Sequence, residues 1–298
     1  MVDKGMALNS RFRAIPLLSA LVALLSASPL SVNATPRPDT ALSDSAPKGF
    51  QGLGFFNPTD GGGSWLTNAT VIGNHTYGEP LNIVVSANSD PYIMTESGFE
   101  DWCLSIQYSK QPGDITLGGK QSANLGDGNG QREQIDLLRF DYSVPVFGTL
   151  NETLFGGSHF RYWLQNGPNA NSSAWFLAAS VEMSLAEHHM IVPNGYDRGR
   201  DEFVGNATAS NGTLSPATKF TFSATSQLLP FLPANSSAGI NHDIKTDGNV
   251  AIVTVKVTNN NPPPTSGSTA VMPTVMPAQI YAIGVASTVL SLAIASFL

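Results

Sequence analysis

Polar and apolar residues alternate along two neighbouring segments in the middle of the chain, 157–164 (GSHFRYWL) and 174–184 (AWFLAASVEMS). Such alternation places every second side chain on the same face of a β-strand. In the first segment, for example, Phe160 and Tyr162 share one face. Because the turn residues Asn-Gly-Pro at 166–168 lie between the two segments, we predict an antiparallel pair of strands.

Three other segments are short, apolar and rich in β-branched residues, which favours strands. They are 81–87 (LNIVVSA), 218–225 (TKFTFSAT) and 250–257 (VAIVTVKV). The last one follows an Asp-Gly pair at 247–248, which is typical of a turn. The chain is therefore expected to contain at least five strands between its two ends.

Two segments have the three- and four-residue spacing of amphipathic helices, 91–108 and 196–204. Asp90 and Pro91 are suited to the N-cap and the first position of the first helix. Its apolar face is predicted to consist of Tyr92, Phe99, Cys103 and Ile106. Residues 50–258 are thus expected to form a single α+β domain, a mostly antiparallel sheet with two or so helices packed on one face.

The N-terminal segment is typical of a secretory signal peptide. Arg11 and Arg13 precede the apolar run 14–25 (AIPLLSALVALL), and small residues follow. We predict cleavage after Ala34, so that residues 1–34 are removed. The alternative, an uncleaved membrane anchor, is disfavoured because about twenty apolar residues are needed to span a bilayer. The polar segment 35–49 is then a flexible lead-in.

The C-terminal segment is typical of a glycosylphosphatidylinositol (GPI) attachment signal. The chain ends inside an uncharged apolar stretch, and it contains no Lys, Arg, Asp or Glu after Lys256. One of the small residues Ser266, Gly267 and Ser268 is the expected lipid attachment site, within a Pro/Ser/Thr stalk at 259–270. Residues 271–298 would be the removed tail; a retained C-terminal membrane span is the alternative.

Acceptor sites for N-linked glycans (Asn-x-Ser/Thr) are dense in the expected domain. The predicted glycosylated residues are Asn68, Asn74, Asn151, Asn171, Asn206, Asn211 and Asn235. Asn33 also lies in such a sequence, but it is expected to leave with the signal peptide. Together with both chain ends, these sites predict an extracellular glycoprotein at the cell surface.

Composition limits the chemistry further. The only cysteine is Cys103, so no disulfide can form within one chain, and we expect this thiol to be a small buried apolar group. A formal net charge of −7 argues against nucleic acid, which is bound by basic surfaces. The expected partners are the membrane, through the anchor, and an anionic small molecule or a cell-wall component.

Candidate functional residues gather between residues 159 and 201. His159 and His189 are the candidate catalytic residues, because imidazole transfers protons near neutral pH. Arg161 shares a strand face with His159, and guanidinium groups bind phosphate and carboxylate. The candidate substrate-binding residues are Arg161, Trp163, Asp197 and Arg200.

These residues also have ordinary structural explanations. Arg161 can pair with Glu182 across neighbouring strands. Asp197 with Arg200, and Arg198 with Glu202, are helix-surface pairs. The tryptophans suit sugar stacking, but Trp102 and Trp175 fall on apolar faces and are expected in the core.

Metal binding is only weakly indicated by the sequence. The chain contains no H-E-x-x-H, C-x-x-C or EF-hand motif, and no metal site is predicted. His159, His189 and Asp197 would form a three-ligand site only if folding brings them together. No cofactor is identified either.

The chain resembles a family of fungal secreted proteins of unassigned activity. The matching stretches are GEPLNIVVSANSDPYIMTESGF, GGSHFRYWLQNG, HHMIVPNGYDRGRD and GINHDIKTDGNVAIVTVKV. The order H-x-R-x-W, apolar strand, H-x-x-x-P, D-x-x-R-D is also similar, more distantly, to the C-terminal domain of bacterial LssY-type membrane proteins. The matching positions are His159, Arg161, Trp163, His189, Pro193, Asp197, Arg200 and Asp201, with one residue more between the proline and Asp197. Neither family implies a particular reaction.

Two functions of different class are compatible with these observations. The first is a GPI-anchored surface protein that acts as a binding or structural module without catalysis. The second is an extracellular hydrolase of a phosphate or other anionic ester. In that case His159 and His189 would transfer protons, and Arg161 and Arg200 would clamp the anion.

Overall fold

The computed structural model describes residues 52–72, 74–111 and 119–259. The expected signal peptide, the lead-in and the lipid-attachment segment lie outside these ranges. Among the described residues, no helix has the length and apolar character needed to cross a membrane. The account that follows concerns this described part of the chain.

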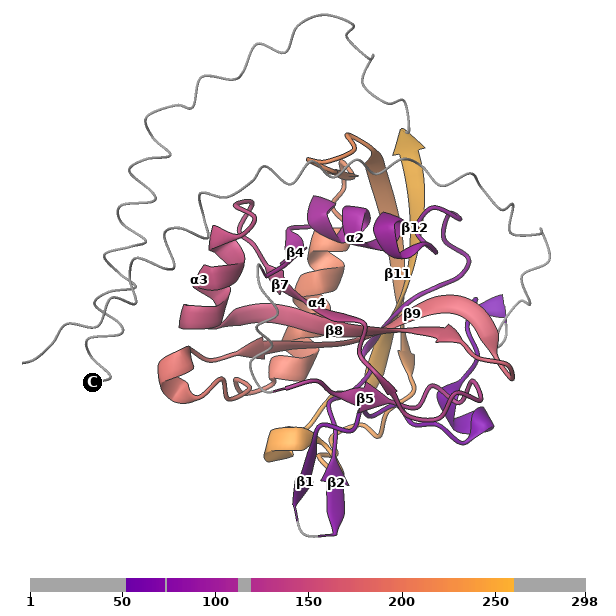
Figure 1. Cartoon of the computed structure of the whole chain (residues 1–298), viewed down its shortest axis with the longest axis vertical. Coiled ribbons are helices and arrows are strands. Elements are labelled where there is room, and N and C mark those ends of the chain that lie inside the picture. The colour runs from indigo at the N-terminus through magenta and orange to yellow at the C-terminus, as the bar shows by residue number, and fades with distance from the viewer. Residues whose placement is uncertain (1–51, 73, 112–118, 260–298) are drawn as a thin grey trace, which may run out of the picture. The chain divides into compact units, whose positions relative to one another are not determined.

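The described residues build one large mixed sheet (Figure 1). Its eight strands lie side by side in the order β10 (Thr213–Leu214), β11 (Thr221–Pro230), β12 (Asn249–Asn259), β3 (Ile83–Val85), β9 (Asn171–Glu182), β8 (Gly157–Asn166), β7 (Asp136–Phe140) and β4 (Tyr108–Lys110). Every neighbouring pair is antiparallel except β12 and β3. Two small antiparallel pairs accompany the sheet, β1 (Thr70–Ile72) with β2 (His75–Tyr77), and β5 (Ser122–Ala123) with β6 (Arg132–Glu133).

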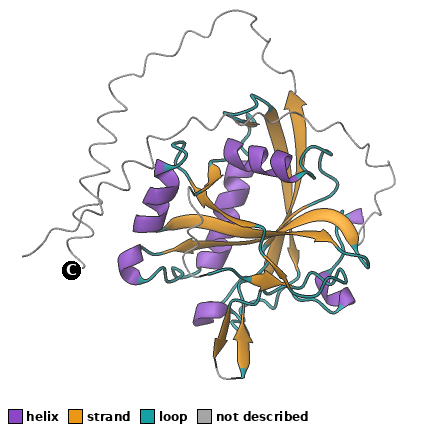
Figure 2. Ribbon diagram, viewed as in Figure 1, coloured by secondary structure: helices purple, strands orange, loops and turns teal. Residues whose placement is uncertain are grey.

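Within the described ranges the α-helices are α2 (Glu96–Ser105), α3 (Phe147–Phe155) and α4 (Gly195–Ala207), and Figure 2 draws helical segments in purple beside the orange strands. Short 3-10 turns occur at η2 (Pro58–Gly61), η3 (Leu185–Glu187) and η4 (Asn241–Asp243). The predicted α+β class and the mostly antiparallel sheet are confirmed.

One face of the sheet carries the main hydrophobic core, against which α2 and α4 pack. The ring of Phe99 on α2 stacks on Trp175 of β9, with centroids 4.7 Å apart. Phe203 on α4 meets Phe160 of β8 edge-on at 5.2 Å. Burial of such aromatic side chains stabilises the fold by about 3–5 kcal/mol each when compared with alanine. The apolar residues that the alternation places on one face of the central strands are therefore the ones that pack in this core.

The opposite face of the same strands is divided between an apolar and a polar half. The apolar half includes Trp163 and Phe176, whose strands also pair in register. Beside it, the rings of Trp65 and Phe231 stack at 4.8 Å. The polar half lies toward β7 and receives Glu152 from α3. This half contains the candidate site.

The first helix begins later than the sequence predicts. Thr95, not Asp90, is the N-cap, and its Oγ1 accepts a hydrogen bond from the N–H of Gly98 at 3.1 Å. Asp90 instead accepts the backbone N–H of Val257 at 2.6 Å, so it ties this segment to β12. Consecutive turns fill residues 91–94. The prediction was wrong because Asp-Pro suits a turn as well as a helix start.

Helix α4 lies unusually close to β9. A methyl group placed at Gly199 would lie 2.5 Å from the backbone nitrogen of Ser180, which is shorter than any normal contact. Gly205, on the same helix, has open space around the corresponding position. Gly199 therefore allows this short distance between α4 and the sheet, because it has no side chain.

These two glycines provide a matched test of that contact. We expect Gly199→Ala to lower the free energy of unfolding by about 2 kcal/mol or more, because backbone must move. Gly205→Ala should raise it by roughly 0.5–1 kcal/mol, since alanine favours the helix. Chemical denaturation of both variants measures the difference. Equal effects of the two substitutions would refute the close approach.

Candidate functional site

Arginine, histidine and glutamate side chains gather at the polar half of the sheet. Strand pairing places Arg139 of β7 opposite His159 of β8, and His159 opposite Ser180 of β9. Directly opposed residues point to the same side of a sheet. Glu182 lies two residues after Ser180, so it shares this face. Glu152 of α3 completes the cluster.

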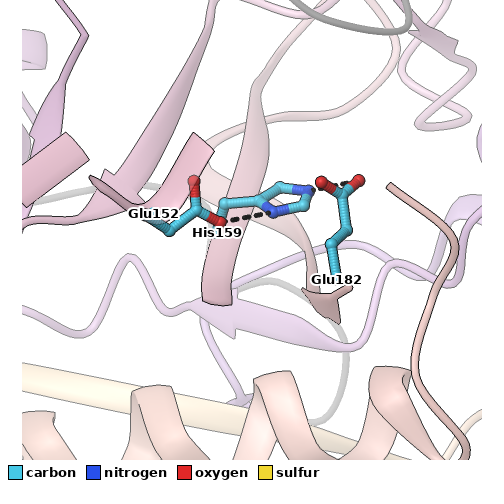
Figure 3. Close-up of side chains that lie close together, drawn as sticks. All are labelled: Glu152, His159 and Glu182. Carbon is cyan, nitrogen blue, oxygen red and sulfur yellow. Dashed lines mark ion pairs between the residues drawn. The ribbon is translucent and has the colours of Figure 1, made fainter. Parts of the chain in front are cut away.

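His159 lies between two carboxylates (Figure 3). Its Nδ1 is 3.4 Å from Oε1 of Glu152, and its Nε2 is 3.4 Å from Oε1 of Glu182. The other oxygen of Glu152 accepts a hydrogen bond from Arg139 at 2.5 Å. Glu152 is 0% exposed and His159 is 1% exposed, so this is an internal cluster.

His189 reaches the same cluster from the segment that follows η3. Its Nδ1 is 3.2 Å from Oε2 of Glu182. The residue has a left-handed backbone (φ 52°), directly after a capping box in which Ser184 and Glu187 bond each other. The two histidines that the sequence singled out thus flank a single carboxylate.

Glu182 is held in its ionised form. Burial by itself raises the pKa of this carboxyl, but the charge of His159, the contact with His189 and the charge of Arg139 together lower the pKa to about 2. The guanidinium of Arg139 faces two carboxylates, so one negative charge is left inside the protein unless an imidazole carries a proton. A proton or another cation is needed to balance the cluster.

Arg161 lies outside this cluster. It donates to Oε1 of Gln134 at 2.8 Å and to the carbonyl of Gly119 at 3.2 Å, and its Nε is 3.9 Å from Glu79. The suggested pairing of Arg161 with Glu182 is wrong, because the register places Arg161 opposite Ala178. Arg139, on the neighbouring strand, is the arginine near Glu182 instead.

Arg200 and Asp197 form a third, separate group. Arg200 donates to both oxygens of Asp247 at 2.7 and 2.9 Å and to Asp201 at 2.9 Å, while Asp197 lies 3.6 Å away. Burial raises the pKa of Asp247, but the bond from Arg200, the bonds with Asn249 and the charge of Arg200 together outweigh this and bring the pKa to about 2. Asp197 also accepts the N–H of Asp247. This group joins α4 to the turn before β12.

Trp163 is buried, and its indole N–H donates to the carbonyl of Arg132 at 3.0 Å. The ring lines a cavity of 230 Å³ together with Asp127, Arg132 and Glu133. All four tryptophans are 5% exposed or less, so none offers a free face for sugar stacking.

The candidate residues therefore do not share one pocket. His159 and His189 meet at Glu182, whereas Arg161, Trp163 and the Asp197–Arg200 pair lie in three other environments. A ligand set of His159, His189 and Asp197 is not formed either. Arg198 and Glu202, by contrast, make the expected exposed pair at 3.4 Å.

Sequence reasoning missed Arg139 and Glu152 altogether. Both lie in elements, β7 and α3, that the hydrophobic pattern did not predict. Glu182 was assigned to the correct strand face but to the wrong arginine. For Arg139 a signal was present, because a lone charged residue inside an apolar run, here Leu-Leu-Arg-Phe at 137–140, is seldom left unpaired.

Cys103 is 0% exposed and free, as expected for a small apolar core residue. Burial raises the pKa of its thiol, and the nearby carboxylates Glu100 and Asp101 raise it further. A thiol in this environment is a poor nucleophile.

No family model matches the chain, and no curated protein or solved structure is found to be similar to it. The resemblance to fungal secreted proteins and to the LssY-type domain stays a prediction.

The buried and exposed arginines of α4 provide a matched test of the Arg200 group. We expect Arg200→Met to lower the free energy of unfolding by about 3–5 kcal/mol, because it leaves Asp197 and Asp247 facing each other without a cation. Arg198→Met should change it by less than about 0.5 kcal/mol. Urea denaturation at neutral pH measures both. A small loss in Arg200→Met would mean that the group is not structural.

Proposed function

We propose that this chain is a secreted, N-glycosylated protein of the cell surface, held by a GPI anchor, whose domain is a binding module and not a hydrolase. One observation supports the claim that the domain is not a hydrolase. Arg161 and Arg200, the two residues needed to clamp an anionic ester, are buried and engaged by internal acceptors. Because Arg161 and Arg200 are 4% exposed or less, a substrate phosphate in solvent cannot reach their donors.

The surroundings of the acceptor asparagines support glycosylation. Five of them are exposed and two are half-buried, so an added glycan would meet solvent and not the core. The exposed ones are Asn74, Asn151, Asn171, Asn211 and Asn235; the half-buried ones are Asn68 and Asn206. A bulky polar modification is compatible with folding only at such positions.

The absence of any disulfide within one chain is compatible with secretion here, because the domain has an extensive core of its own. Two clusters of buried apolar residues cover the two faces of the sheet. A domain of about 200 residues buries enough surface to be stable without cross-links.

The 230 Å³ cavity beside Trp163 is our candidate binding position. Three carboxylates line it, Glu96, Asp127 and Glu133, against the single guanidinium of Arg132. Excess negative charge disfavours an anion, so a neutral, hydroxyl-rich segment of a cell-wall polysaccharide fits better than an anionic small molecule. Leu125, Ile135 and Leu164 supply the apolar part of the lining.

A lipid anchor predicts release by phosphatidylinositol-specific phospholipase C. We expect treatment of intact cells to move the protein into the medium, and deglycosylation to lower its apparent mass in steps. Immunoblotting of cells and medium measures both. Retention on cells from which a known GPI-anchored protein is released would argue for a membrane span instead.

A larger side chain in the cavity should weaken ligand binding without unfolding the domain. Ile135 lines the cavity and is 39% exposed, so Ile135→Trp is expected to weaken the binding of soluble chitin or β-glucan oligosaccharides at least tenfold. Val144→Trp, at a residue that is 52% exposed and not part of the lining, is the control. Titration calorimetry measures the affinities. Equal binding by both variants, or none by the unaltered protein, would refute this position.

A further inference from the structure

We propose that Glu152, His159, Glu182 and His189 form a structural binding site for Zn²⁺. The first three offer donor atoms that all lie within 4.8 Å of one another. His189 lies 3.2 Å from Glu182 but outside this group of three, so its ring would have to turn toward the ion to become the fourth ligand. Imidazole nitrogen and carboxylate oxygen are, with thiolate, the usual ligands of zinc, and zinc bonds of about 2.0–2.2 Å hold donors roughly 3.4 Å apart. This inference does not depend on the function proposed above.

Several polar atoms of the cluster have no hydrogen-bond partner among the described residues. They are Oε1 of Glu152, Nδ1 of His159, and both ring nitrogens of His189. All of these atoms are buried, and an unmet polar atom in the interior costs about 1–3 kcal/mol. A bound cation would be coordinated by the lone pairs of these oxygens and nitrogens.

The charges of the cluster also favour a cation. Arg139 balances only one of the two carboxylates, so one negative charge remains when the imidazoles are neutral. A Zn²⁺ ion would change this charge from −1 to +1, whereas a proton on His159 would bring it to zero but leave the nitrogens of His189 unsatisfied. Zinc engages both histidines in their neutral form. Calcium and magnesium prefer an all-oxygen set, so they fit these residues less well.

The outer contacts are those that a metal site needs. Arg139 bonds the second oxygen of Glu152 and thereby fixes the orientation of that carboxylate. Ser180 Oγ forms a hydrogen bond of 3.2 Å with Nε2 of His159, which orients the imidazole ring. Partners of this kind orient first-shell ligands and commonly contribute 10- to 100-fold in metal affinity.

The ligands come from parts of the chain that the sheet alone does not hold together. Glu152 belongs to α3, His159 to β8, Glu182 to the end of β9, and His189 to the segment after η3. A zinc ion here would connect α3 and the η3 segment to the ends of the interior strands β8 and β9. In a chain that forms no internal disulfide, it would be the only strong cross-link among these described elements. Because Glu152 and His159 are 0% and 1% exposed, the role is structural.

The experiment uses purified protein that has been stripped with a chelator and then titrated with Zn²⁺. We expect one equivalent to bind and the melting temperature to rise by roughly 5–10 °C at about one hundred times Kd. His189→Gln and Glu182→Gln should lower zinc affinity at least tenfold. His189 is only half-buried, so His189→Gln is expected to fold. If Glu182→Gln does not fold, the zinc affinity of His189→Gln decides whether the site exists.

His188→Gln is the matched control, because His188 is exposed and shares the left-handed backbone of its neighbour. It should bind zinc like the unaltered protein. The proposal is overturned if zinc neither binds nor stabilises the unaltered protein, if His189→Gln binds as tightly as His188→Gln, or if Ca²⁺ raises the melting temperature equally. In the first case a proton on an imidazole balances the cluster instead.

Discussion

The antiparallel pairing of β8 with β9 is the interaction on which the rest of this structure depends. It joins two long interior strands over nearly their whole length, and each direct pair points to one side of the sheet. On one side the pair presents Phe160, Tyr162 and Leu177 to the helices. On the other side it places His159 beside Ser180 and brings Glu182 into the same layer. A slip of one residue would exchange the core and the charged cluster.

The charged residues of the domain are mostly used to hold elements together. Arg200 connects α4 to the turn before β12, and Arg139 connects β7 to α3. Arg161 donates hydrogen bonds to Gln134 and to the carbonyl of Gly119. A buried guanidinium needs several acceptors, and here three different groups of acceptors supply them. This arrangement explains why the same residues look like an anion site in the sequence and do not form one in space.

The elements with strong periodicity were predictable from sequence. The central hairpin, α4 and the strand now seen as β12 all appear near their expected bounds, because alternating or three-to-four spacing requires burial on one side. Helix α3 and strand β7 were not predicted. Both are short, and α3 has exposed apolar residues such as Phe147 and Phe155, so neither has a clear apolar face. The parallel contact of β12 with β3 also escaped prediction, since residues far apart in the chain make it.

The amino-acid sequence alone was enough to predict the α+β class, the core face of the central strands and the buried free thiol of Cys103. Which charged groups meet depends instead on how the elements pack together. Sequence spacing defines the face on which a side chain lies, but an ion pair also depends on the register of the neighbouring strand and on the helices above it. Glu152 lies seven residues before His159 in the chain, yet a turn and the end of α3 are required to bring its carboxylate to that ring.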